Sequence, residues 1–162
     1  MTATPAIEGW FTTGPEPVLL GSRCLACGNV SFPREQEFCC NPACRGEDFE
    51  GVQLSRRGRV WSCTDAQYQP PPPYVPATDP YEPFALAAVE LPEGIVVLGQ
   101  LAAGFGVRDV SVGSEVELVV ERLYTDETGD RTVWKWRPSA SSEERTSDRG
   151  RSQAQPLIGG EQ

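Results

Sequence analysis

Histidine is absent from this sequence of 162 residues, and lysine occurs only once, at Lys135. Without histidine, the Ser-His-Asp and Cys-His catalytic arrangements, imidazole acid–base chemistry and histidine-ligated metal sites are all excluded. A single lysine also gives little basis for Schiff-base catalysis. An independent enzyme would have to use carboxylates such as Asp65, Asp79 and Glu82, and nothing in their spacing indicates such a site. We therefore predict no catalytic residue in this chain and no activity when it is alone.

Positive charge is scarce as well. The chain has 14 Lys and Arg residues against 23 Asp and Glu residues, which gives a formal net charge of −9. Because nucleic-acid binding draws its affinity from clustered basic side chains, a nucleic-acid partner is not expected. The one basic cluster, Arg56-Arg57-Gly58-Arg59, is short and is interpreted as solvated arginines at a turn.

The sequence also lacks long apolar segments. The uncharged stretch at residues 94–107 is interrupted by glycine and falls short of the roughly 20 residues that a membrane-spanning helix needs. The N-terminal residues 1–7 have neither the basic nor the apolar part of a secretion signal. These features predict a cytoplasmic protein that does not enter a membrane and whose thiols stay reduced.

What the sequence does contain is two close cysteine pairs, Cys24-x2-Cys27 and Cys39-x4-Cys44, with eleven residues between them. This spacing suits a structural zinc site, in which four soft ligands close a tetrahedral shell. Cys40 offers a rival second pair, Cys40-x3-Cys44, so the spacing alone leaves the choice between the adjacent thiols open. We predict one structural Zn²⁺ per chain.

Three other interpretations of these cysteines stay open. Disulfides would suit a small secreted domain, although the N-terminus argues against export. Iron–sulfur ligation by the same four thiolates also fits the spacing. A redox pair at Cys24 and Cys27 has less support, because no strand followed by a helix surrounds it. Cys63 lies in a predicted strand and is interpreted as a small buried hydrophobic residue.

Four zones follow one another along the chain. Residues 1–22 carry aromatic residues followed by prolines, which predicts a short helix or an extended arm. Residues 23–54 form the zinc ribbon, where a metal replaces the core that so short a segment cannot build. Residues 55–138 form a barrel of strands. Residues 139–162, rich in Ser, Glu, Arg, Asp and Gln, are expected to be disordered.

The third zone alternates apolar and polar residues with a period of two, which indicates short strands. The clearest example is 115–121, where Val116, Leu118 and Val120 share one face opposite three glutamates. A hairpin turn is expected at 92–94, between strands at 84–91 and 95–101. Further strands are predicted at about 60–65 and at 132–137. Five such strands without a long helical pattern predict a mainly β protein with a small Greek-key barrel rather than a doubly wound sheet.

A proline-rich stretch at residues 69–84 interrupts the barrel pattern. Proline cannot pair within a central strand, so this stretch predicts a long, stiff and partly polyproline loop. Loops of this length are usually functional or disordered.

A zinc ribbon before a five-stranded barrel resembles the family of acyl-CoA-associated OB-fold proteins, whose members carry a rubredoxin-like zinc ribbon. The resemblance covers about residues 8–138 and rests on Gly21-Ser22-Arg23-Cys24-Leu25-Ala26-Cys27-Gly28, Ser31-Phe32-Pro33-Arg34, Asn41-Pro42-Ala43-Cys44, Gly58-Arg59-Val60-Trp61-Ser62, Phe84-Ala85-Leu86-Ala87 and Arg137-Pro138. The family's second cysteine pair reads Cys-Pro-Asn-Pro-x-Cys, which this chain matches if Cys40 replaces the first proline. The resemblance thus implies the zinc ligands Cys24, Cys27, Cys39 and Cys44, with Cys40 left over.

Members of this family resemble small subunits of thiolase-fold enzymes, so the resemblance implies a non-catalytic accessory subunit. The implied partners are acyl-CoA thiolases or aldolases, such as those that release a steroid or other side chain from its acyl-CoA. The barrel would stabilise the partner and shape its acyl-CoA entrance, with acyl-CoA at the shared interface. The proline-rich loop and the aromatic residues Trp10 and Phe11 are the predicted contact surfaces.

A nucleic-acid-binding module built from a zinc ribbon and an OB-fold is the second hypothesis. OB barrels bind oligonucleotides on aromatic side chains along a basic groove, and four aromatic residues could form such a platform: Trp61, Tyr68, Trp134 and Trp136. A place in the core or at a partner interface is favoured for them, because the residues beside them are not basic enough to follow a phosphate backbone. Salt-dependent binding to single-stranded oligonucleotides separates the two hypotheses.

Overall fold

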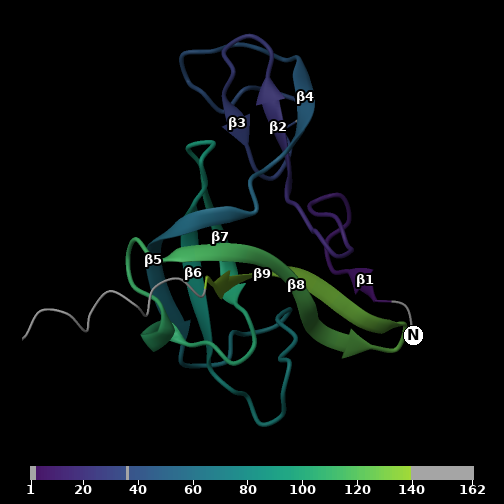
Figure 1. The fold of residues 1–162 in the computed structure, drawn as a ribbon. Coiled ribbons are helices and arrows are strands. Elements are labelled where there is room, and N and C mark those ends of the chain that lie inside the picture. The colour runs from purple at the N-terminus through teal and green to yellow at the C-terminus, as the bar shows by residue number, and fades with distance from the viewer. Residues whose placement is uncertain (1–2, 36, 140–162) are drawn as a thin grey trace, which may run out of the picture.

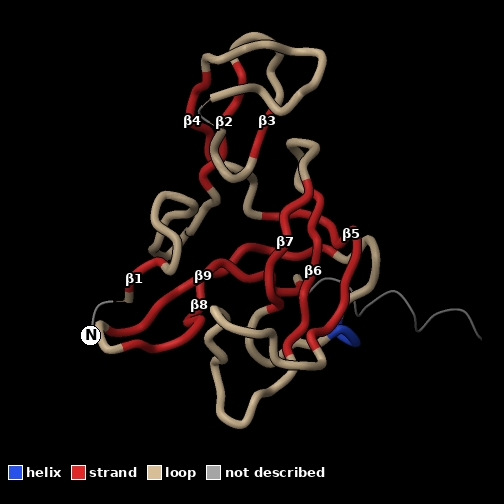
Figure 2. Tube along the Cα trace, turned by 180° about the vertical axis from the view of Figure 1, so that it is seen from behind, coloured by secondary structure: helices blue, strands red, loops and turns tan. Residues whose placement is uncertain are grey.

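The computed structural model describes residues 3–35 and 37–139, and most of its regular structure is strand (Figure 1). A three-stranded ribbon stands above a five-stranded barrel, and both views show a short linker between them (Figure 2). The mainly β architecture confirms the prediction from the alternating pattern. Within the described residues, no helix has the length and apolar character needed to cross a membrane.

The ribbon is an antiparallel sheet in the order β3-β2-β4. Its strands are β2 (Leu20–Cys24), β3 (Val30–Ser31) and β4 (Phe49–Gln53). Strand β2 pairs with β4 over its whole length, and its last residue, Cys24, lies opposite Phe49. The first candidate ligand therefore sits on a paired strand, whereas the other candidate cysteines lie in the loops that follow.

The barrel consists of β5 (Arg57–Ala66), β6 (Phe84–Glu90), β7 (Val96–Leu101), β8 (Glu115–Asp126) and β9 (Gly129–Pro138). Strands β5, β6 and β7 form an antiparallel meander, β8 pairs with both β5 and β9, and β9 pairs in parallel with β7. The circuit β5-β6-β7-β9-β8 thus closes on itself. A closed five-stranded barrel of this order is the OB-fold architecture that the resemblance implied.

The hydrophobic core lies inside the barrel. Alternate positions of β6 face inward, so its burial pattern switches at every residue and leaves Ala85, Ala87 and Val89 buried. Val116 and Leu118 of β8 are completely buried, as the alternation at 115–121 predicted. The indole of Trp136 joins the same cluster and is also completely buried.

The turns between the barrel strands follow the sequence signals. The hairpin between β6 and β7 turns at 92–94, where Gly94 has a φ of +79° that suits a glycine. Strand β8 extends beyond the predicted 115–121, because residues up to Asp126 continue to pair with β9. A single 3-10 turn, η1 (Val107–Asp109), lies between β7 and β8.

The first zone folds back onto the barrel and has no helix among its described residues, 3–22. It begins with β1 (Thr4–Pro5), which pairs in parallel with β9. Phe11 is only 4% exposed and Trp10 is half-buried, because both rings pack against Trp134 of the barrel at centroid distances of 5.8 and 5.9 Å. The prediction of an exposed aromatic contact surface is wrong for Phe11, whose apolar ring is removed from water instead.

Residues 67–83 form the predicted proline-rich loop, which joins β5 to β6 at the end of the barrel away from the ribbon (Figure 1). Aromatic packing holds it in place: the ring of Tyr74 stacks on Phe84 at 6.2 Å, and the Tyr81 hydroxyl donates to the Ala66 carbonyl at 2.7 Å. Of the tail predicted to be disordered, 139–162, all but Ser139 lies outside the described residues.

Candidate metal centre and barrel pocket

Four cysteine sulfurs converge at the far end of the ribbon. The Sγ atoms of Cys24, Cys27, Cys39 and Cys44 all lie within 4.8 Å of one another. Cys24 Sγ is 3.9 Å from Cys44 Sγ, and Cys27 Sγ is 3.6 Å from Cys39 Sγ. A zinc ion at about 2.3 Å from each of four tetrahedral sulfurs would hold them about 3.8 Å apart. These two sulfur–sulfur distances agree with that value, so the donor set fits a zinc ion.

Each cysteine pair lies in a tight turn held by backbone hydrogen bonds. In the first turn, the Gly28 N–H donates to the Cys24 carbonyl and the Cys24 N–H to the Asn29 carbonyl, both at 2.9 Å. Gly28 has a φ of +76°, which a residue with a Cβ rarely adopts. In the second turn, the Cys44 N–H donates to the Asn41 carbonyl at 2.9 Å. These turns fix the sulfur positions through the backbone.

Gly46 belongs to the same site, and the sequence analysis did not identify it. A Cβ at this position would lie 2.8 Å from Cys24 Sγ, so the close approach of backbone to sulfur requires glycine. Its N–H donates to Cys44 Sγ at 3.3 Å, and its carbonyl accepts from the Cys39 N–H at 3.0 Å. A glycine shortly after each cysteine pair, at Gly28 and Gly46, was the signal in the sequence.

The four thiols lie close enough to shift one another's pKa values. The backbone N–H of Asn29 lowers the pKa of Cys27 to about 7. The N–H of Asn41 also lowers the pKa of Cys39, but burial and the neighbouring thiols outweigh it and raise that pKa to about 12. One sulfur thus ionises readily while its neighbour resists a second negative charge. A divalent cation would relieve this repulsion and deprotonate the remaining thiols.

The other two cysteines lie outside the cluster. The Cys40 thiol is exposed, accepts a hydrogen bond from the Asn29 amide at 3.1 Å and lies 3.4 Å from the Ser31 hydroxyl. Cys63 on β5 is partly buried and packs against the barrel core, in line with its interpretation as a small hydrophobic residue. All six cysteines are described and all are free thiols, so the disulfide interpretation is wrong for this structure.

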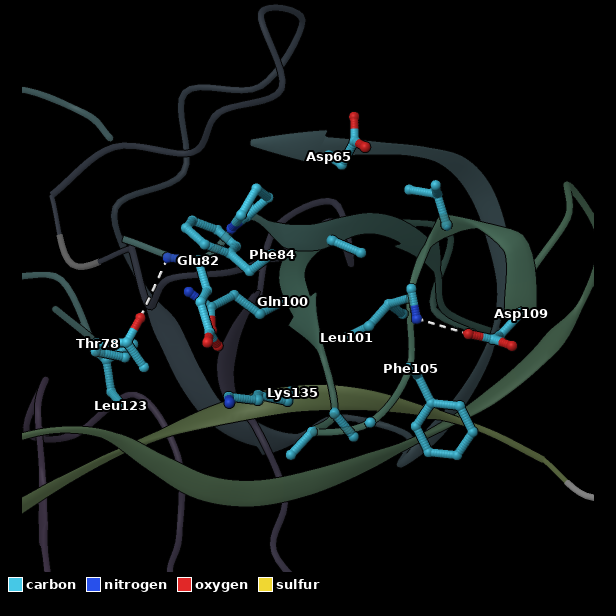
Figure 3. A pocket seen from close by; sticks show the side chains of 18 of the residues that line it. Asp65, Thr78, Glu82, Phe84, Gln100, Leu101, Phe105, Asp109, Leu123 and Lys135 are labelled. Atoms are coloured by element: carbon cyan, nitrogen blue, oxygen red, sulfur yellow. Dashed lines mark hydrogen bonds between the residues drawn. The ribbon is translucent and has the colours of Figure 1, made fainter. Parts of the chain in front are cut away.

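A pocket of about 700 Å³ opens under the proline-rich loop (Figure 3). Its walls come from that loop, from residues 100–109 and from the barrel strands. At its edge lies the chain's single lysine, Lys135, whose side chain is 12% exposed and whose Nζ is 3.3 Å from Glu121 Oε2. The same carboxylate oxygen accepts the Ala103 N–H at 2.9 Å.

The carboxylates that the sequence offered for catalysis do not form a catalytic group. Asp65 and Glu82 both line the pocket, but Figure 3 shows their carboxylates apart, and Asp79 is not part of the lining. Asp65 accepts a hydrogen bond from the Gln67 amide, and Lys135 is paired with Glu121. The pocket therefore has the size of a ligand site, while its described residues include no base held next to a nucleophile.

The four aromatic residues proposed as a nucleotide platform are not brought together. Trp134 and Trp136 are 8% and 0% exposed and belong to the core, whereas Trp61 and Tyr68 are exposed. The Trp134 indole N–H is also used, because it donates to the Leu98 carbonyl at 3.2 Å. Two of the four rings are thus unavailable for stacking on bases.

The basic cluster is likewise not a phosphate site. Arg57 and Arg59 lie on β5 rather than at the predicted turn, because both pair with residues of the neighbouring strand β8. Each arginine of the cluster faces a carboxylate: Arg56 lies 3.3 Å from Glu16, Arg57 4.0 Å from Glu117 and Arg59 3.5 Å from Glu115. Glu117 is also paired with Arg137, so these ion pairs offset most of the positive charge that a nucleic-acid backbone would need.

Comparison with known proteins agrees with both modules. Residues 13–50 match the family model described as the ChsH2 rubredoxin-like zinc ribbon domain, and residues 51–121 match the ChsH2 C-terminal OB-fold domain. The benzoylsuccinyl-CoA thiolase subunit BbsA of Thauera aromatica is 33% identical over 116 residues, which cover 72% of each chain. A DUF35 domain-containing scaffold protein of Methanocaldococcus jannaschii is 31% identical over 82% of this chain and 89% of its own.

A solved structure described as the Ltp2-ChsH2(DUF35) aldolase is also similar. It superposes with a TM-score of 0.55 at 28% identity, over 75% of this chain and 84% of the matched one. The residues matched by the two family models, 13–121, include the cysteine cluster and the strands β5, β6 and β7 of the barrel.

Proposed function

Because the chain belongs to the ChsH2 family, whose members join a rubredoxin-like zinc ribbon to an OB-fold domain, we propose that it is a non-catalytic accessory subunit of a thiolase-fold enzyme. One observation carries the proposal: most of the chain is similar to a protein named as a subunit of a CoA thiolase. The enzyme in question is an acyl-CoA thiolase or aldolase, and this chain stabilises it and helps to shape its acyl-CoA entrance. We place the complex in the cytoplasm.

The chemistry available in the chain supports a non-catalytic role. Thiolase-type bond formation or cleavage needs an acid–base pair, and the sequence has no histidine to supply one. Lys135 is held against Glu121, and the pocket carboxylates lie apart. The catalytic residues of the complex therefore belong to the enzyme subunit.

The cysteine cluster is the proposed zinc site, with Cys24, Cys27, Cys39 and Cys44 as ligands. Four thiolates close the coordination shell, which leaves zinc no open position for a substrate and gives it a structural role. Cys40 is proposed to be a spare thiol, because its sulfur turns toward Asn29 instead of the cluster. We further propose residues 23–54 as the extent of the ribbon and 55–138 as the extent of the barrel.

The barrel pocket is proposed as the contribution of this chain to the acyl-CoA entrance. Its volume lies in the range of small-molecule sites, and its lining combines aromatic rings with a few polar groups. The proline-rich loop that covers it is fixed by ring contacts, so a partner would dock on it with little loss of conformational freedom.

Coexpression with candidate thiolase-fold subunits tests the proposed function. We expect a complex that coelutes in gel filtration and cleaves an acyl-CoA substrate, while the purified chain alone has no such activity. The enzyme subunit without this chain should lose solubility or turnover. Cleavage of acyl-CoA by the chain alone, or failure to form a complex with every thiolase-fold candidate, would contradict the proposal.

A further inference from the structure

An apolar patch is exposed on the outer face of the barrel sheet formed by β5, β6 and β7. Trp61, Leu98 and Val96 are 63%, 58% and 49% exposed, respectively. Ala88 lies between them, because it pairs with Ser62 on β5 and with Leu98 on β7. We call Trp61, Ala88, Val96 and Leu98 the outer patch. It crosses three adjacent strands without a charged residue among its members.

The sequence does not explain this face as an ordinary solvent-exposed side of a sheet. An antiparallel strand with one face in water alternates apolar and polar residues, yet β7 places Val96 and Leu98 outward while Val97 is buried. On β5, the irregularity between Val60 and Ser62 inserts Trp61 as an extra residue on the strand. Contiguous exposed apolar side chains of this kind mark a surface that another molecule covers.

The charges around the outer patch indicate which kind of molecule can bind to it. Arg59 at its border is paired with Glu115, and the exposed Glu90 lies opposite Val96 at the same border, so the patch has no unpaired arginine there to attract a polyanion. A second copy of the chain is also disfavoured, because each copy carries a net charge of −9 and two copies repel each other. An uncharged apolar surface on a different protein meets neither obstacle.

The outer patch also leads to the barrel pocket. Outward positions of β7 continue from Val96 and Leu98 to Gln100, and Gln100 lines the pocket. A protein seated on the patch would therefore lie beside the pocket mouth. This is the position that an enzyme subunit needs if the pocket borders its acyl-CoA entrance.

We propose that the outer patch is the docking surface for the thiolase-fold subunit, with the Trp61 indole as its central anchor. The inference rests on the proposed function, since it takes the partner from there. Tryptophan is enriched among the residues that dominate binding energy, and its large apolar ring gains most when a partner excludes water around it. The partner surface is apolar at its centre, facing Trp61 and Leu98.

The test uses the thiolase-fold subunit that coelutes with the chain. A Trp61→Ser, Leu98→Ser double variant should weaken its binding at least tenfold, as measured by titration calorimetry, without loss of zinc. Phe38→Ser is the matched control, because Phe38 is similarly exposed, at 66%, but lies on the ribbon. Its affinity should equal that of the wild type. Equal weakening by the control would overturn the assignment of the patch.

Hydroxyl-radical footprinting of the unaltered complex gives an independent answer that does not depend on how a variant folds. Trp61 and Leu98 should lose most of their reactivity when the enzyme subunit binds, whereas Phe38 should keep its own. If a complex forms and Trp61 stays reactive, the patch assignment fails and the accessory function stands. If no thiolase-fold subunit binds, the patch assignment and the proposed accessory function both fail. If self-association or single-stranded DNA protects Trp61 instead, the patch binds a second copy of the chain or a nucleic acid, and the assignment to the enzyme subunit is wrong.

Discussion

The ribbon and the barrel are stabilised by different means, although they belong to one short chain. Among the described residues of 20–53, only Gly21, Ser22 and Cys24 are buried, so the ribbon has almost no apolar core. The barrel buries Val116, Leu118 and Trp136 completely, together with many other apolar residues. Metal ligation can supply folding free energy to a segment too small for a core. The ribbon therefore depends on its thiolates, and the barrel on burial of apolar surface.

The two regions nevertheless touch: Val30 and Val52 of the ribbon pack against the hydrophobic core cluster, and an aromatic cluster also joins the regions. Phe32 from the ribbon packs against Trp134 of the barrel and against Trp10 of the first zone, each at a ring-centroid distance of 5.6 Å. Trp134 is buried as part of the barrel core. Unfolding of either region should therefore remove this aromatic contact. The strength of the contact influences how independently the ribbon and the barrel unfold.

Of the changes considered, metal removal should produce the largest difference in stability between the ribbon and the barrel. Chelation is expected to unfold the ribbon before the barrel, because apparent zinc binding to such sites is worth about 10–16 kcal/mol and the ribbon has no core to replace it. Elemental analysis should give one zinc per chain before chelation. Amide NMR spectra should then lose the ribbon signals and keep those of the barrel. Simultaneous loss of both would show that they fold as one unit.

Single ligand changes separate the two adjacent thiols. Cys39→Ser should lower the zinc content severalfold, because it leaves three sulfurs around the ion. Cys40→Ser is the matched control and should retain full zinc, since the Cys40 sulfur contacts Asn29 and Ser31 instead. The reverse pattern would move the third ligand to Cys40.

The barrel should respond to a loss of core volume and leave the metal in place. Leu118→Ala removes a completely buried side chain, and such changes cost about 2–5 kcal/mol. Denaturant unfolding should show this loss for the barrel transition, while elemental analysis shows unchanged zinc. Val119→Ala, at the next position of β8 and only partly buried, is the control and should cost much less. Loss of zinc from Leu118→Ala would mean that the ribbon depends on the barrel.

The aromatic contact between the regions should have an intermediate effect. Phe32→Ala is expected to cost about 1–2 kcal/mol, less than a fully buried phenylalanine, because Phe32 is only half-buried. Its main consequence should be a wider separation between the ribbon and barrel transitions during chelation. If the two transitions keep the same separation, the cluster does not couple them.

The sequence predicted much of this architecture because its signals were local. Cysteine spacing located the cluster, and period-two alternation located Val116 and Leu118 in the core. The fate of the aromatic residues was harder to predict, since burial of Phe11 against Trp134 depends on how zones distant in sequence meet. Gly46 was missed although a glycine follows each cysteine pair, because its contact with Cys24 Sγ forms only in the folded loop. The pairing of Arg57 and Arg59 with glutamates of β8 likewise required the barrel to close.

The tip of the β8–β9 hairpin differs from the rest of the barrel, because it belongs to the barrel sheet but is held by polar contacts. Asp126 accepts hydrogen bonds from the Thr128 hydroxyl at 2.5 Å and N–H at 2.8 Å, and lies 2.7 Å from Arg131. These contacts, the Thr128 hydroxyl foremost, lower the pKa of Asp126 to about 2. A lowered pKa stabilises the folded tip at pH values above the unfolded pKa of about 3.9. That contribution is lost as the pH falls toward 2.

We therefore expect amide exchange at the hairpin tip to quicken between about pH 4 and pH 2, beyond the intrinsic pH effect, while exchange in the barrel core changes little. The effect should be smaller than those of metal removal, core truncation and Phe32→Ala, because the carboxylate is exposed and salt screens it. Asp126→Asn should remove the pH dependence, since the amide cannot ionise. Glu127→Gln, one residue further along the same turn, is the control and should keep it. A tip whose exchange responds to Glu127→Gln but not to Asp126→Asn would show that the Thr128 and Arg131 contacts do not hold the turn.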